Sequence, residues 1–236
     1  MIELRGTSVI YPNGVRVLSN TDLFIDRGEF VFLVGPTGSG KSTLLRLIYR
    51  DIIPAFGEVW VNGQNIGTLK RSHVPYLRRK MGIVFQDFKL LPDKTIFDNV
   101  AYAMEVIGAS RQEIRRKVPR VLGLVGLASK ASSHSEELSG GEQQRAAIAR
   151  AIVNDPAILI ADEPTGNLDP DTAWELMQIL QKINMRGTTL LVATHNGQIV
   201  DRLRKRVIVL IDGNIVEDKE KGVYSYGAKN SGVFST

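Results

Sequence analysis

The chain has 236 residues, of which 43% are hydrophobic and 23% charged, and its formal net charge is +5. This length and apolar content predict one compact domain and exclude a disordered chain. The sequence has no cysteine and three histidines, which excludes disulfides and thiolate zinc sites, so we expect any bound metal to be a hard, oxygen-liganded ion. No apolar run approaches the ~18–20 residues that span a bilayer, and residues 1–5 do not open a secretory signal. We therefore expect a soluble protein that stays inside the cell.

Positive charge is concentrated in three short runs, at residues 78–80, 115–117 and 204–206. Such runs suit anionic lipid or nucleic acid, but they more often form a solvated surface. Aromatic side chains are not interleaved with them, as a face that binds single-stranded nucleic acid would require. We predict solvated surface charge and no nucleic-acid binding.

The first part of the chain is rich in predicted strands bounded by turn residues. Strands are expected at residues 2–10, 15–25 and 30–34, and a further hairpin strand at 58–61. The first two read as antiparallel strands that lead into a buried third one.

Residues 89–155 change to helical periodicity. Helices are expected at residues 100–107, 111–124 and 141–153, and we interpret the segment of about 88–155 as a helical lobe. After it, continuous apolar runs at 157–161 and 189–193 flank a helical pattern at 172–184, which is typical of a βαβ unit in a parallel sheet. Residues 207–211 and 214–217 form a predicted hairpin, and 223–236 read as a loose, Gly- and Ser-rich tail.

A phosphate-binding loop is predicted after the third strand. Residues 35–42 read Gly-Pro-Thr-Gly-Ser-Gly-Lys-Ser and match the pattern of a loop that wraps phosphates with backbone N–H groups at a helix start. Lys41 is expected to reach the β- and γ-phosphates, and the Ser42 hydroxyl to bind Mg²⁺. The nucleotide-binding residues expected here are Gly35, Pro36, Thr37, Gly38, Ser39, Gly40, Lys41, Ser42 and Thr43.

Two carboxylates follow the buried run at 158–161. Open α/β sheets bind ligands at the carboxyl ends of their strands, so Asp162 and Glu163 are expected beside the phosphates. Asp162 would hold Mg²⁺ together with Ser42. Glu163, one residue on and on the other side of the strand path, would act as general base toward the attacking water.

A second glycine motif begins a helix at residues 138–145, which read Leu-Ser-Gly-Gly-Glu-Gln-Gln-Arg. Ser139 and Glu142 have the spacing of a capping box, while Gly140 and Gly141 leave backbone N–H groups accessible to an anion. A γ-phosphate needs donors on both sides during transfer, and a second chain can supply them. The motif therefore predicts a site completed by another copy of the chain.

With these motifs the sequence resembles the ABC-type ATP-binding subunits over nearly its whole length. The resemblance implies a P-loop NTPase domain over residues 1–222, with an antiparallel β subdomain, a RecA-like parallel-sheet core and a helical lobe. It implies ATP and Mg²⁺ as cofactors, a Mg²⁺-dependent ATPase activity and a head-to-tail dimer. It also implies that Gln86 senses Mg²⁺ and the membrane partner, that His195 contacts the γ-phosphate, that Asp169 crosses the dimer, and that Tyr11 stacks on adenine.

The segment at residues 73–91 resembles the cell-division ATP-binding subunits of the FtsE group, and Asp87–Leu91 after the glutamine resembles them most specifically. That resemblance implies a peripheral position on the cytoplasmic side of the membrane, the membrane protein FtsX as partner, and indirect control of a cell-wall hydrolase. Lipoprotein-release and macrolide-export ATPases share residues 162–169 closely and remain the alternative.

Overall fold

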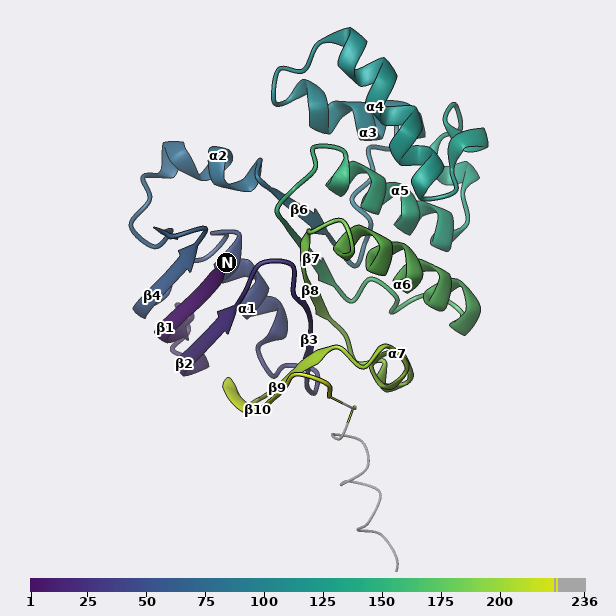
Figure 1. Ribbon diagram of the computed structural model, residues 1–236. Helices are drawn as coiled ribbons and strands as arrows, with labels where there is room; N and C mark the ends of the chain where they lie inside the picture. Colours follow the sequence, from purple (N-terminus) through teal and green to yellow (C-terminus); the bar gives the residue numbers. More distant parts are fainter. Residues whose placement is uncertain (223, 225–236) are drawn as a thin grey trace, which may run out of the picture. The chain divides into compact units, whose positions relative to one another are not determined.

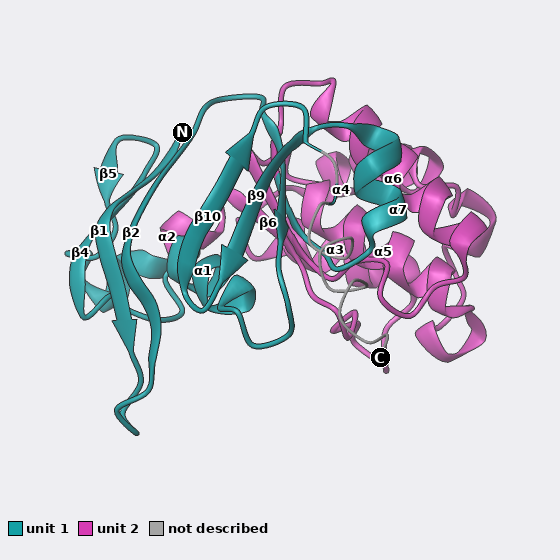
Figure 2. Ribbon diagram, turned by 90° about the horizontal axis from the view of Figure 1, so that it is seen from below, with its two compact units in different colours: residues 1–74, 191–236 teal, residues 75–190 magenta. Residues whose placement is uncertain are grey.

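The computed structural model describes residues 1–222 and 224, so the predicted tail at 223–236 lies almost entirely outside the described residues. The chain forms two compact units (Figure 2). Unit 1 joins residues 1–74 to the chain from 191 onward, and unit 2 comprises residues 75–190.

Unit 1 contains a four-stranded antiparallel sheet of order β2-β1-β4-β5. Its strands are β1 (Ile2–Ile10), β2 (Arg16–Ile25), β4 (Phe56–Val61) and β5 (Gln64–Asn65). Ile2 pairs with Ile25 on one side and with Val61 on the other, and all three side chains are buried. The predicted strands are confirmed, and β4 begins two residues before the predicted start.

The second sheet of unit 1 carries the phosphate loop. Its strands β3 (Phe30–Val34) and β9 (Arg206–Ile211) are parallel, and β10 (Asn214–Lys219) pairs antiparallel with β9. All five β3 residues are buried, as the continuous apolar run predicted. Helix α1 (Lys41–Ile48) follows β3 through the loop, and α7 (Gly197–Leu203) follows β8 (Thr189–Ala193).

Unit 2 joins the strands β6 (Met81–Val84) and β7 (Ile158–Asp162), in parallel register, to a group of helices (Figure 1). The strand order is β8-β7-β6 in this unit and β10-β9-β3-β8 in unit 1, because β8 is divided between the units after Leu190. The longer helices of unit 2 are α3 (Ile96–Glu105), α4 (Arg111–Leu124), α5 (Gly140–Ile152) and α6 (Pro170–Asn184). The first three pack against one another, which confirms a helical lobe.

Three helical segments differ most from the sequence-based expectation, and the starts of α5 and α6 differ by only one and two residues. Helix α3 begins four residues before the predicted start because Thr95 caps it by accepting a hydrogen bond from the Asp98 amide. The short helix α2 (Val74–Arg78) and helix α7 were not predicted. The start of α7 had a readable signal, since the Asn196 side chain caps it through the Ile199 amide.

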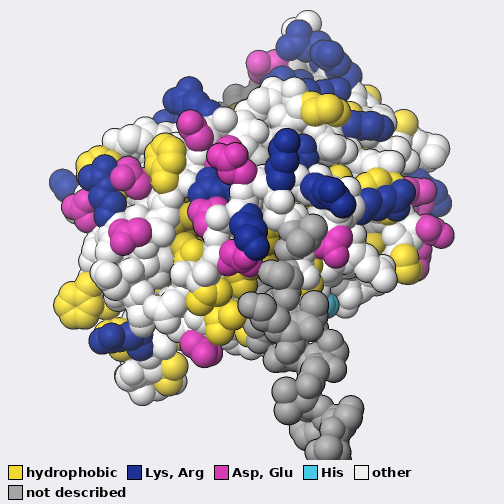
Figure 3. All heavy atoms as spheres, turned by 60° about the horizontal axis from the view of Figure 1, so that its bottom comes forward, with side chains coloured by type: hydrophobic (Ala, Val, Ile, Leu, Met, Phe, Trp, Pro, Cys, Tyr) yellow, Lys and Arg dark blue, Asp and Glu magenta, His cyan; other side chains and the backbone are white. Residues whose placement is uncertain are grey.

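The expectation that all three basic runs are solvated was wrong for Arg206, whereas Arg204 of the same run is exposed. The Arg206 side chain is only 17% exposed, and its guanidinium binds both Glu29 and Asp218 at 2.7 Å. These hydrogen bonds, those to Asp218 first, raise the pKa of Arg206. Elsewhere Lys and Arg side chains lie among Asp and Glu side chains over much of the face in Figure 3, which fits a solvated surface.

Within residues 1–222 and 224, no helix combines the length and the apolarity that crossing a bilayer requires.

Candidate nucleotide-binding site

The phosphate loop of unit 1 depends on glycine for its shape. Gly35 has φ 150°, and a Cβ there would lie 2.0 Å from the Leu210 carbonyl oxygen, so the loop start fits only glycine. Gly40, at φ 105°, stands at the N-cap of α1 and supplies no side-chain cap. The helix start therefore has no side-chain cap, and helix starts of this kind are typical phosphate-binding sites.

Lys41 is buried and points back into this loop. Its Nζ atom donates hydrogen bonds to the carbonyl oxygens of Gly35 at 2.8 Å and Pro36 at 3.0 Å. Ser42, the next residue, is exposed at the start of α1. The ammonium group thus lies against the first two residues of the loop.

Tyr11 lies beside this helix. Its hydroxyl is 3.2 Å from the Thr43 hydroxyl, and Arg46 donates a hydrogen bond to it at 3.4 Å. These contacts hold the half-buried ring next to the first turn of α1. Stacking on adenine stays a prediction.

His195 lies at the same edge of unit 1 as the phosphate loop. The Thr194 amide donates to the Leu33 carbonyl at 3.1 Å, so β8 and β3 end side by side, and the exposed His195 follows directly. The residue after it, Asn196, has a local role as the cap of α7.

In unit 2, Gln86 follows β6 and the two carboxylates lie at the end of β7, at the same edge of the sheet. Val84 is in register with Ala161, so the residues that follow β6 and β7 emerge together. The Gln86 amide nitrogen lies 3.9 Å from the position that a Cβ on Gly166 would occupy. Gly166 in turn donates its amide to the Glu163 carbonyl at 3.1 Å, which places Gln86 beside the turn that carries the expected general base.

Glu163 lies in this turn with φ 47°, a conformation that non-glycine residues adopt at a cost. Strand β7 ends at Asp162, so the direction of the Glu163 side chain is set by the turn. The sequence argument took the direction of the Glu163 side chain from the alternation of side chains along a strand. That reason was wrong, because Glu163 lies outside the strand. Backbone strain of this kind is concentrated at functional sites.

The second glycine motif begins α5 as predicted. Ser139 Oγ accepts from the Glu142 amide at 3.3 Å, and Glu142 Oε2 accepts from the Ser139 amide at 2.9 Å, which confirms the capping box. The bond from the Ser139 amide is the main cause that lowers the pKa of Glu142. The two glycines that follow Ser139 form the first residues of the helix.

These two glycines have different surroundings, which leads to a stability prediction. A Cβ on the buried Gly141 would lie 2.4 Å from Thr172 Cγ2 of α6, whereas one on the exposed Gly140 would approach only Leu168, at 4.0 Å. We expect Gly141→Ala to lower the free energy of unfolding by about 1–3 kcal/mol, through overpacking between α5 and α6. Gly140→Ala is the matched control, with an expected change within about 0.5 kcal/mol. Urea unfolding of both variants checks this, and equal losses would contradict it.

Asp169 caps α6. Its Oδ1 atom accepts hydrogen bonds from the amides of Asp171 at 3.1 Å and Thr172 at 3.0 Å. Hydrogen bonds from Thr172, its side chain first and then its amide, lower the pKa of Asp169. Its predicted position across a dimer stays a prediction beside this local role.

The comparisons with known proteins agree with these motifs. Residues 18–166 match the ABC transporter family. The chain is 54% identical to "Cell division ATP-binding protein FtsE" of Streptococcus pneumoniae serotype 2 over 96% of this chain and 98% of that protein. It is 53% identical to the protein of the same name from Bacillus subtilis, over 95% and 98%. The chain belongs to the FtsE family of ABC transporter ATP-binding proteins.

A solved structure supports the same fold. The dimeric structure of a post-hydrolysis state of the ATP-binding cassette MJ0796, bound to ADP and Pi, has a TM-score of 0.86 and 36% identity, covering 95% of this chain and all of that one. This likeness confirms an ABC nucleotide-binding fold with an antiparallel sheet, a parallel core and helices. That cassette is a dimer with ADP and Pi bound.

The magnesium ion expected for the family fits the chemistry of the residues present. Ser42, Gln86 and Asp162 offer a hydroxyl, an amide and a carboxylate oxygen, which are the ligand types that Mg²⁺ prefers. The described residues contain no group of three or more His, Cys, Asp or Glu that would enclose a metal. Three oxygen ligands of this kind suit Mg²⁺, because this ion retains waters and takes phosphate oxygens.

Sequence reasoning missed two residues that hold the segment after Gln86. Arg150 of α5 donates hydrogen bonds to the carbonyls of Phe88, at 2.8 Å, and Lys89. Phe88 and Lys89 are both left-handed, at φ 57° and 49°. Burial lowers the pKa of Arg150.

The second is Asn99 of α3, which is fully buried. Its side chain accepts from the Leu91 amide at 2.7 Å and donates to the carbonyls of Leu91, Lys94 and Thr95 at 3.0–3.2 Å. No motif signals either contact, because each joins a helix residue to backbone that only the fold brings near.

Proposed function

We propose that this chain hydrolyses Mg·ATP in composite sites formed by two copies, and that the cycle drives a membrane complex in bacterial cell division. One domain over residues 1–222 carries the activity. The observation that supports the proposal is that two helices of one chain begin at glycines. Helix α1 follows Gly40, which supplies no side-chain cap, and α5 begins with Gly140 and Gly141 after its cap Ser139. One helix start holds the phosphates of a nucleotide in its own chain, and the other supplies donors to the nucleotide of the second copy.

The proposed roles follow from the residue chemistry. Lys41 exchanges its two loop carbonyls for phosphate oxygens, and the His195 side chain reaches the γ-phosphate from the end of β8. Ser42, Asp162 and Gln86 would hold the Mg²⁺, which would supply positive charge beside the phosphates. Glu163 orients the attacking water and accepts its proton.

Cell division is proposed because the chain is 54% identical to a protein named for it over nearly full length. We propose FtsX as the membrane partner, a peripheral position on the cytoplasmic face, and indirect action on a cell-wall hydrolase. The segment after Gln86 is the contact site for a cytoplasmic helix of that partner, since it lies at the site edge and is held by α5.

The test measures ATP turnover of the purified chain with Mg²⁺ or EDTA, each with and without the cytoplasmic segments of FtsX. We expect turnover that requires Mg²⁺ and rises when the partner segments are added. Purification of the chain from membranes under mild detergent should recover FtsX. Recovery of a lipoprotein-release or macrolide-export permease instead would replace cell division by export.

A further inference from the structure

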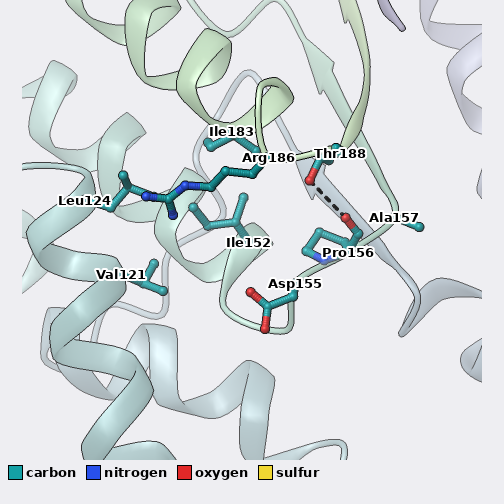
Figure 4. Close-up of a pocket in the computed structure, with 10 residues that line it drawn as sticks. Val121, Leu124, Ile152, Asp155, Pro156, Ala157, Ile183, Arg186 and Thr188 are labelled. Carbon is teal, nitrogen blue, oxygen red and sulfur yellow. Dashed lines mark hydrogen bonds between the residues drawn. The ribbon is translucent and has the colours of Figure 1, made fainter. Parts of the chain in front are cut away.

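A hollow of about 260 Å³ lies in unit 2, beside Ala157, which directly precedes β7 (Figure 4). It is bounded by the C-terminal part of α4, the α5–β7 turn and the α6–β8 turn. Ala157 and Thr188 precede β7 and β8, whereas Asp162 ends β7. At ~3.3 Å per strand residue the hollow is about 17 Å along β7 from Asp162, so it is separate from the acidic end of this strand.

Two turns form one side of this hollow and are held together. The Thr188 hydroxyl donates to the Pro156 carbonyl at 3.2 Å, and the Thr189 amide donates to the Ala157 carbonyl at 2.9 Å. Asn184 donates to the Thr188 carbonyl at 2.9 Å, which fixes the end of α6. The hollow is therefore built into the fold.

The floor of the hollow is apolar and its rim is cationic. Figure 4 shows the Arg186 side chain extending toward Leu124 above Ile152, with Val121 beside them. The adjoining hollow of about 330 Å³ shares four lining residues with it and adds three, among them two cations. The shared residues are Val121, Leu124, Asp155 and Arg186, and the added ones are Lys117, Arg120 and Val153.

Charge at the rim is unbalanced. Lys117 Nζ lies 2.7 Å from Asp155 Oδ2, and this ion pair joins α4 to the α5–β7 turn. Within residues 1–222 and 224, the guanidinium groups of Arg120 and Arg186 make no hydrogen bond or ion pair. Three cations thus face one carboxylate over an apolar floor.

We propose that this hollow, lined by α4 and the two turns, docks an acidic protein segment with an apolar anchor side chain. Its carboxylates pair with Arg120, Arg186 and Lys117, and its anchor fills the space above Val121 and Ile152. Charge complementarity selects an acidic partner, and a volume near the lower end of ligand pockets, ~300 Å³, accommodates one or two side chains.

Other anionic partners fit the hollow less well. A flat anionic membrane could pair with the basic rim but would leave the hollow unfilled, because Ile152 and Ile183 are buried at its base. Single-stranded nucleic acid requires aromatic platforms, and no aromatic residue is among the lining residues. The basic run at 115–117 contributes Lys117 to this surface, so part of that run has a specific role.

The test uses the full chain and a short fluorescein-labelled peptide of Glu and Asp around a Leu-Phe pair, followed by fluorescence anisotropy. We expect binding that weakens about tenfold in the double variant Arg120→Glu/Arg186→Glu, because two attractive pairs become repulsive. Arg111→Glu is the matched control, since it changes charge on the same helix away from the hollow, and its affinity should change less than about threefold. ATP turnover should be unchanged in all three proteins, which separates this proposal from the proposed function.

Two further measurements complete the test. Val121→Phe fills the hollow without changing charge and should abolish peptide binding, as should a peptide with Ser in place of the Leu-Phe pair. Absence of peptide binding to the unaltered chain would overturn the proposal. Equal peptide binding by the control and double variants would also overturn it. So would a chain that binds anionic phospholipid vesicles or a single-stranded oligonucleotide but does not bind the peptide.

Discussion

Replacing Glu163 with Gln is expected to lower ATP turnover by about 10²–10⁴-fold while ATP binding is retained. An amide has the shape of the carboxylate but cannot accept the proton of the attacking water. Since Gln is compatible with the same left-handed backbone as Glu at φ 47°, the turn that joins β7 to Gly166 should be unaffected. The loss should therefore appear in turnover and leave the free energy of unfolding nearly unchanged.

The Glu163→Gln variant should also accumulate as a dimer when ATP is present. A nucleotide that cannot be hydrolysed continues to join the phosphate loop of one copy to the second glycine motif of the other. Light scattering after size exclusion, with and without ATP, measures this directly. Glu175→Gln on the exposed face of α6 is the matched control and should retain full turnover. Turnover at the unaltered rate in Glu163→Gln would remove Glu163 from its assigned role.

The elements that sequence predicted well are those in which one local signal decides the structure. The apolar run at 30–34 became the fully buried strand β3, and the glycines of residues 35–40 became the loop at the start of α1. Helix ends were predicted less well, since α3 begins at a cap that the apolar periodicity does not include. Short α2 and α7 have too few turns to show a period.

In the candidate site, too, residues signalled by a local motif were predicted and residues that depend on the fold were not. Motifs with fixed spacing located Lys41, Glu163 and Ser139 because their chemistry is confined to a few adjacent residues. The residues that position them are distant in sequence, as Arg150 is from Phe88, and such pairs are brought together only by packing of α5 against β6. For Glu163 the residue type predicted a general base, but the sequence pattern did not predict the left-handed backbone at this residue.

Arg150→Met is expected to lower the free energy of unfolding by about 2–4 kcal/mol. The variant leaves the carbonyls of Phe88 and Lys89 without their charged donor and leaves two consecutive left-handed residues without support. Each left-handed residue costs roughly 1–2 kcal/mol, so the segment after Gln86 should relax. Hydrogen exchange should therefore accelerate in residues 86–91 and change little in the phosphate loop.

Two variants distinguish support of this segment from a general loss of packing. Arg150→Lys retains the charge but has a single nitrogen, so it should recover part of the stability and leave exchange at 86–91 faster than in the unaltered chain. Arg145 lies on the same helix, and its ion-pair partner Glu175 is 3.8 Å away and largely exposed. Arg145→Met should therefore lower the free energy of unfolding by no more than about 1 kcal/mol. Equal exchange at 86–91 in Arg150→Met and Arg145→Met would contradict the support of this segment by Arg150. Because the segment follows the predicted magnesium-sensing Gln86, faster exchange there should be accompanied by a smaller rise in turnover when the membrane partner's segments are added.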